Sequence, residues 1–311
     1  MTCLTLTNLR CSSPTALATF LFEHPGIEIL HLDIIIHSGN FSPPNCLPQG
    51  CLPHLREVKA SKEIVNAILE CPSHTPRPLA AIKGFKLSGH PTGNNAVDIN
   101  STRSIPDAIF LSNLKTKAIN VRTIELSGWH DMEEIRKLIP SIPNVQYLDL
   151  GKKLGAMARR NGHTERGGPS SNPGLPASNI TEWIDLLSTL PQLSTLHGVK
   201  FFYEVSSAPA DTWVSTCDAS TSTLAMACAN STRQSHTAQM SMMERSRMRK
   251  NDEIAGVLAW KCGKLRWVDH WDEGSSKIIQ LLRDNDVLQT DDGGTPSGKD
   301  KVRWEVRRVK C

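Results

Sequence analysis

The chain has 311 residues, of which 39% are hydrophobic and 21% are charged, and its 35 basic and 31 acidic side chains leave a formal net charge of +4. This near balance argues against a protein dedicated to nucleic acid or another polyanion. No apolar run approaches the roughly 20 residues of a membrane-spanning helix, so we expect no membrane partner. A chain of this length can bury a sizeable core without disulfides.

The nine cysteines are scattered along the chain without a paired spacing. This pattern favours free thiols in a reducing compartment. The first residues lack the basic region and the apolar stretch of a signal peptide. We therefore expect a cytoplasmic or nuclear protein. Cys46 and Cys51 lie near His54 but lack a second pair of ligands, so the sequence predicts no metal site, and we expect no cofactor.

A short apolar motif recurs from the first residues onward. It consists of an apolar residue, two spacers, a second apolar residue, one spacer and usually a third apolar residue, as in Ile27-Leu30-Leu32. We place its middle residue at Leu4, Leu30, Val58, Phe85, Ile124, Leu148, Leu196 and Val268. Several neighbouring copies lie about 25 residues apart, within the period of a leucine-rich repeat. The local alternation predicts a short strand with one buried face.

Helix signals lie between these strands. The expected helices follow Ser13, Ser61, Asp131, Ser178, Asp252 and Ser276, each of which precedes spaced apolar residues. Asp131 and Glu134 form the spacing of a capping box before Ile135. Strands and helices that alternate at a fixed period imply an α/β fold with parallel strands and outer helices.

The lead-ins to several strands carry a more specific resemblance. Leu52-Pro53-His54-Leu55 and Ile142-Pro143-Asn144-Val145 are two examples. They resemble the leucine-rich repeats of fungal-type F-box proteins, over residues 1–200 and 250–285. The resemblance implies an irregular solenoid with parallel strands on its concave face and helices on its convex face. The F-box segment itself is not present in this sequence.

The expected organisation has four parts. Residues 1–205 form the repeat solenoid, with Gly/Pro/Ser-rich insertions at 91–106 and 155–178. Residues 206–250 are a low-complexity insertion that we expect to be disordered, and a retained intron is an alternative origin for it. Residues 251–285 continue the repeat, and residues 286–311 form a polar tail with a terminal basic strand.

Three motifs could indicate catalysis or nucleic-acid binding. Residues 293–300 approach a nucleotide-binding loop, but Asp300 stands where a magnesium-binding hydroxyl is needed. The acidic and histidine cluster at 130–134 is better explained by helix capping than by acid–base chemistry. The basic run at 244–250 has no interleaved aromatic residues and indicates a solvated surface. We therefore expect a protein that is not an enzyme.

The spacer positions of the strands form the candidate site. Because side chains alternate along a strand, the spacers face away from the core. The expected protein-binding face comprises His31, Lys59, Lys86, Glu125, Tyr147, Asp149, Trp267 and Asp269. Mixed charge with large aromatic residues suits a protein or peptide, although ordinary solvated strands carry similar residues.

The preferred function is a non-catalytic protein-binding module. The family resemblance implies a substrate receptor that holds a protein for ubiquitin transfer, with ubiquitin-ligase subunits as partners if an F-box lies upstream. Alternatives are a ligase-independent interaction protein or a truncated gene-model fragment, and, less favoured, an enzyme on a repeat scaffold.

Overall fold

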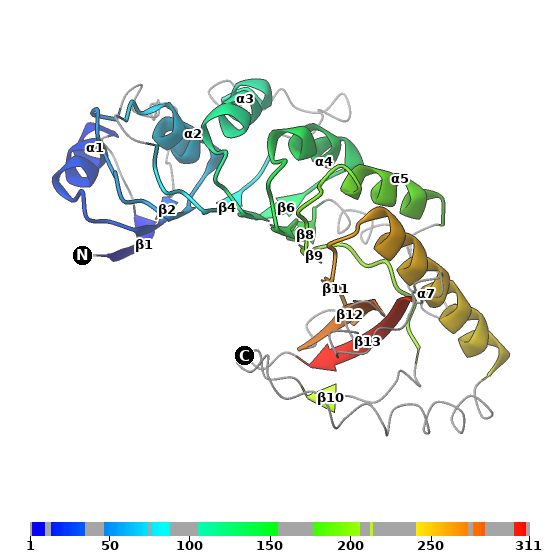
Figure 1. The fold of residues 1–311 in the computed structure, drawn as a ribbon. Helices are drawn as coiled ribbons and strands as arrows, with labels where there is room; N and C mark the ends of the chain where they lie inside the picture. Colours follow the sequence, from blue (N-terminus) through cyan, green and yellow to red (C-terminus); the bar gives the residue numbers. More distant parts are fainter. Residues whose placement is uncertain are drawn as a thin grey trace, which may run out of the picture. The chain divides into compact units, whose positions relative to one another are not determined.

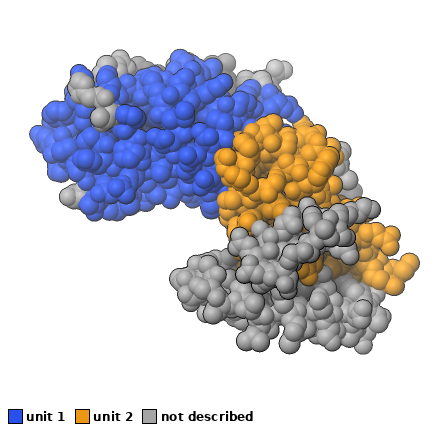
Figure 2. Space-filling model, in the orientation of Figure 1, with its two compact units in different colours: residues 1–164 blue, residues 165–311 orange. Residues whose placement is uncertain are grey.

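The computed structural model has a mixed α/β fold with mostly parallel strands and helices between them (Figure 1). It describes residues 2–9, 14–34, 47–73, 76–87, 105–154, 177–205, 212–213, 241–272, 276–283 and 302–308. The chain divides into two compact units, Met1–Thr164 and Glu165–Cys311, which Figure 2 draws in different colours.

Unit 1 contains a sheet in which every neighbouring pair of strands is parallel. In spatial order the strands are β1 (Cys3–Leu9), β2 (Ile29–Ile34), β3 (Glu57–Lys59), β4 (Ala81–Phe85), β5 (Thr123–Leu126) and β7 (Tyr147–Asp149). A second, two-stranded sheet pairs β6 (Gly128–Trp129) with β8 (Lys152–Lys153). Spatial order follows chain order along the main sheet, as the strand–helix alternation predicts.

Helices cover one face of this sheet. They are α1 (Pro14–Glu23), α2 (Lys62–Glu70), α3 (Asp107–Lys117) and α4 (Met132–Leu138), the last followed by the short 3₁₀ helix η2 (Ile139–Ser141). Figure 1 shows α1 to α4 on the same side of strands β1, β2 and β4. The central strand residues are each at most 5% exposed: Leu4, Leu30, Val58, Ile82, Ile124 and Leu148. The core of unit 1 therefore lies between the helices and one face of the sheet.

The backbone repeats the same hydrogen bonds at successive strands. The carbonyl of Glu28 accepts from the amides of both Arg56 and Glu57, at 2.7 and 3.0 Å. The carbonyls of Arg56, Ala80 and Arg122 each accept two amides from the next strand in the same way. This doubled contact sets a common register at the start of each strand, so equivalent residues lie side by side.

One strand of unit 1 differs from its predicted register. The middle residue of the fourth motif is Ile82, which pairs with Val58 and Ile124, and not Phe85. Gly84 adopts a left-handed backbone with φ of 77°, and the pairing with β5 shifts between Lys83 and Phe85. A bulge at this glycine inserts one extra residue, which the simple motif spacing does not reveal.

Unit 2 combines parallel and antiparallel pairing. Its elements are α5 (Ala177–Leu187), β9 (Thr195–His197), β10 (Thr212–Trp213), α7 (Met242–Lys261), β11 (Trp267–Asp269), β12 (Lys277–Arg283) and β13 (Val302–Arg308). Strand β11 is parallel to β9 and antiparallel to β12, which is antiparallel to β13. Helix α7 packs against β12 and β13, where Trp304 is 1% exposed. The basic strand expected near the C-terminus is therefore confirmed as β13.

The structure corrects two expectations for unit 2. The helix predicted after Ser276 is wrong, because residues 277–283 form strand β12, paired along its length with β13. The helix expected after Asp252 begins earlier, at Met242, and takes in residues 242–250, which belong to the predicted low-complexity insertion. Ser241 and Glu244 form a complete capping box that accounts for this earlier start.

Several expectations fall outside the described residues. They concern most of the insertions at 91–106 and 155–178, most of 206–250, and the nucleotide-loop-like residues 293–300.

Helix α5 begins at Ala177, so its predicted start at Ser178 is off by one or two residues. Among the described helices, none combines the length and apolar character needed to cross a membrane.

Candidate functional site

The outward face of the unit 1 sheet carries a row of polar residues in register. Pairing places His31, Lys59, Lys83, Glu125 and Asp149 beside one another on β2, β3, β4, β5 and β7. Each follows a buried central residue, so its side chain projects from the opposite face of the sheet. We call these five residues the outward row.

The outward row contains four of the residues predicted for the binding face, namely His31, Lys59, Glu125 and Asp149. The structure places Lys83, and not Lys86, beside Lys59, because the motif at β4 is centred on Ile82. Lys86 is exposed but follows the end of β4. Tyr147 lies on β7 two residues before Asp149, so it shares the outward face.

Glu57 connects three strands of this face. Its Oε1 atom lies 2.8 Å from Nε2 of His31 and 3.0 Å from Nζ of Lys83. Lys83 Nζ also lies 4.0 Å from Oε2 of Glu125. Burial raises the pKa of Glu57, but hydrogen bonds from His31 and Lys83 outweigh burial, so its pKa is below the usual 4.5. Glu57 is therefore a charged acceptor that fixes its neighbours in place.

Asp149 is held by the loop that follows its strand. Its Oδ1 atom accepts a hydrogen bond of 2.7 Å from the amide of Gly151. Gly151 has a φ of 63°, and a Cβ there would lie 2.7 Å from the carbonyl oxygen of Leu126. The glycine therefore permits the turn that orients Asp149.

Trp267 and Asp269, also predicted for the binding face, lie on β11 of unit 2. The Oδ1 atom of Asp269 is 2.6 Å from Nδ1 of His197, and its Oδ2 atom accepts a 2.6 Å hydrogen bond from the amide of Gly198. Asp269 thus joins β11 to the end of β9. Six of the eight residues predicted for the binding face therefore lie in unit 1, and the other two lie in unit 2.

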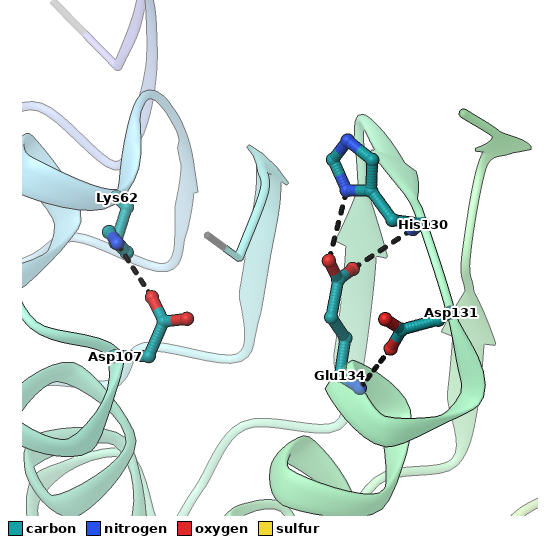
Figure 3. Close-up of polar contacts among 5 residues, drawn as sticks. All are labelled: Lys62, Asp107, His130, Asp131 and Glu134. Atoms are coloured by element: carbon teal, nitrogen blue, oxygen red, sulfur yellow. Dashed lines mark hydrogen bonds and ion pairs between the residues drawn. The ribbon is translucent and has the colours of Figure 1, made fainter. Parts of the chain in front are cut away.

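The cluster at residues 130–134 caps helix α4 (Figure 3). Asp131 Oδ1 accepts from the amide of Glu134 at 3.0 Å, and Glu134 Oε2 accepts from the amide of His130 at 3.0 Å. Glu134 Oε1 is 2.9 Å from Nδ1 of His130. These contacts satisfy backbone amides at the helix start, which confirms the capping interpretation.

Two buried cysteines are poorly suited to act as nucleophiles. Burial raises the pKa of Cys51 and of Cys262 to about 11. Both thiols are therefore protonated at neutral pH, whereas the thiolate is the reactive form. Within the described part of the chain, no group of three or more His, Cys, Asp or Glu side chains is arranged to hold a metal ion.

Comparisons with protein-family models, curated proteins and solved structures found no match.

Two residues of the outward face, Glu57 and Lys83, are absent from the predicted binding face. Lys83 would follow from reading Leu79-Ala80-Ala81-Ile82 as the motif, in place of Ile82-Phe85-Leu87. Glu57 immediately precedes the buried Val58, and alternation puts it on the same face as Lys59. Alternation therefore indicates Glu57 from the sequence, whereas Lys83 depends on the register of β4, which the bulge at Gly84 shifts.

Proposed function

We propose that the chain is a non-catalytic protein-binding module of the leucine-rich-repeat type, similar to the substrate-recognition part of an F-box ubiquitin-ligase receptor. The observation that carries the proposal is the outward row, which parallel strands present in register from a sheet whose other face is buried. A rigid face of mixed charge suits the recognition of another protein. In this proposal the strands line a concave face of a solenoid, the helices form its convex face, and the module acts in the cytoplasm or nucleus.

The repeated backbone supports the assignment to repeat proteins. The amide of Leu55 donates to the carbonyl of Leu52 just before β3, and the amide of Val145 donates to that of Ile142 before β7. The same turn precedes β5, β9 and β11, at Val121, Leu193 and Leu265. A sequence motif and a backbone contact that recur together are typical of repeat architectures.

The proposal is tested by affinity capture with the full chain and two charge-reversal variants. Lys59→Glu reverses an exposed charge of the outward row, whereas Lys115→Glu reverses an exposed charge on helix α3 and serves as the matched control. We expect a set of bound proteins that wild type and Lys115→Glu retain and Lys59→Glu loses. Circular dichroism and urea unfolding establish that both variants fold.

The outcomes separate the alternatives. Ubiquitin-ligase subunits among the retained proteins would support the receptor role. Retained proteins without ligase subunits would favour a ligase-independent interaction protein and reject the receptor role. Equal capture by wild type and Lys59→Glu would reject the outward row as the binding surface.

A further inference from the structure

The outward face of unit 1 separates its charges along the direction that crosses the strands. Lysines occupy β3 and β4, with Lys59 and Lys83 in the outward row and Lys86 just after β4. Carboxylates occupy β5 and β7, with Glu125 and Asp149 in the same row. The face therefore has a basic part, on β3 and β4, and an acidic part, on β5 and β7. On the other side of the basic part lies strand β2, which carries the exposed Asp33.

The basic part keeps positive charge that its neighbours do not neutralise. Glu57, half-buried on β3, is already held by His31 and Lys83. Lys59 is exposed, and the structure gives it no ion pair with any described residue. Its aliphatic stem lies against Gly84, where a Cβ would come within 3.0 Å of Lys59 Cγ. The stem of Lys59 thus lies beside Gly84, and its exposed ammonium is available to a partner.

The acidic part is similarly available. Glu125 lies 4.0 Å from Lys83, at the outer limit of an ion pair. Asp149 accepts a backbone amide from Gly151, and no basic side chain pairs with it among the described residues. Tyr147, on the same face of β7, adds an aromatic surface beside this carboxylate. Tyrosine is a common anchor in protein interfaces.

We infer that the outward row recognises an extended segment of a partner protein that carries an acidic and a basic side chain about four residues apart. Lys59 and Asp149 are separated by three strand-to-strand steps, and strands lie about 4.8 Å apart. The resulting distance of about 14 Å corresponds to about four residues of extended chain at roughly 3.3 Å each. This inference rests on the proposed function and specifies the chemistry of its partner.

The test measures binding of labelled nine-residue peptides to the full chain by fluorescence anisotropy at low salt. One peptide has an acidic and a basic residue four positions apart; two others have two acidic or two basic residues at those positions. A fourth keeps the mixed charges but places them adjacent. We expect wild type to bind the first peptide about fivefold more tightly than each of the others, because two exposed ion pairs are satisfied together.

Charge reversal should change the preferred peptide. Lys59→Glu puts a carboxylate at both positions that contact the peptide, 59 and 149, and should favour the doubly basic peptide. Asp149→Lys puts a lysine at both positions and should favour the doubly acidic one. Asp149→Asn keeps an acceptor for the Gly151 amide and should weaken the preference without reversing it. Lys115→Glu should behave as wild type.

An unchanged peptide ranking in Lys59→Glu and Asp149→Lys would overturn the charge-order inference. If affinity capture still depended on Lys59, the proposed function would stand and only the partner chemistry would be wrong. Failure of both experiments would reject the proposed function together with the inference.

Discussion

Lys62 and Asp107 form an ion pair that joins the first turns of two neighbouring helices in unit 1 (Figure 3). Nζ of Lys62 lies 2.6 Å from Oδ1 of Asp107, and the two side chains are 4% and 20% exposed. A lysine in the first turn of α2 faces the positive end of the helix dipole. Asp107 therefore compensates both the burial of this ammonium and its unfavourable place in the helix.

Asp107→Ala should lower the free energy of unfolding by about 3 kcal/mol, because it removes this partner from a buried charge. Lys62→Met combined with Asp107→Leu should recover most of the loss, since an apolar pair needs no compensation. Urea unfolding of wild type, Asp107→Ala and the double variant measures these values. A loss below about 1 kcal/mol for Asp107→Ala would mean that the pair behaves like an exposed one.

Two helix starts with similar sequence signals should respond differently to alanine. Asp131 accepts a hydrogen bond from the amide of Glu134, whereas the hydroxyl of Ser61, at the start of α2, is buried without a hydrogen-bond partner. Asp131→Ala should therefore lower the free energy of unfolding by about 1 kcal/mol. Ser61→Ala should leave it unchanged or slightly raised, because it removes an unsatisfied group.

Thermal and urea unfolding of the two variants measure the contrast. Asp131→Asn, which retains a side-chain acceptor, should lose less than Asp131→Ala. Equal losses at the two sites would show that the cap hydrogen bond of Asp131 contributes nothing.

The ion pairs of Glu57 should make stability depend on pH in the acidic range. The pKa of this carboxyl is below its usual 4.5 in the folded state, so the carboxylate stabilises the fold above that pH. The contribution is lost as the pH falls through the lowered pKa. The stability difference between wild type and Glu57→Gln should therefore be full near neutral pH and shrink in acid.

Urea unfolding of both proteins between about pH 7 and pH 3 gives this difference directly. Glu253→Gln, at an exposed position of helix α7, controls for the substitution itself. A difference that grows as the pH falls would have the wrong sign and would contradict the role of Glu57.

Two glycines should show opposite effects when replaced by alanine. Gly151 has a φ of 63°, and a Cβ there would lie 2.7 Å from a backbone oxygen, so Gly151→Ala should lower the free energy of unfolding by at least about 2 kcal/mol. Gly256 lies within α7 with open space around it, so Gly256→Ala should raise that energy by about 0.5–1 kcal/mol. Thermal unfolding of the two variants measures both changes. A Gly151→Ala variant that is more stable than wild type would contradict the strained turn.

The sequence predicted the repeated part of unit 1 well, because its central residues are large, apolar and regularly spaced. Leu30, Val58, Ile124 and Leu148 are fully buried as expected. The register of β4 was missed because the bulge at Gly84 adds a residue without changing the apolar character of the segment. Pattern alone could not distinguish Ile82 from Phe85, since both are buried.

The errors in unit 2 have a different physical cause. The segment 277–283 has pairs of apolar residues that fit either a helix or a strand, and its partner β13 is distant in the sequence. The early start of α7 was missed because residues 242–250 contribute no buried side chain, so no apolar periodicity marks them. Only the capping residues Ser241 and Glu244 signal that the helix begins there.

Antiparallel pairing in unit 2 also covers an apolar strand edge. Strand β12, with its sequence KIIQLLR, would present an apolar open edge if β13 were absent, and such edges recruit strands from other chains. Strand β13 pairs with β12 along its whole length and brings Arg303, Arg307 and Arg308 to the sheet. Strand β13 thus shields the apolar edge of β12 from pairing with other chains, and the two-residue strand β10 continues the sheet at Arg307 and Arg308 of β13.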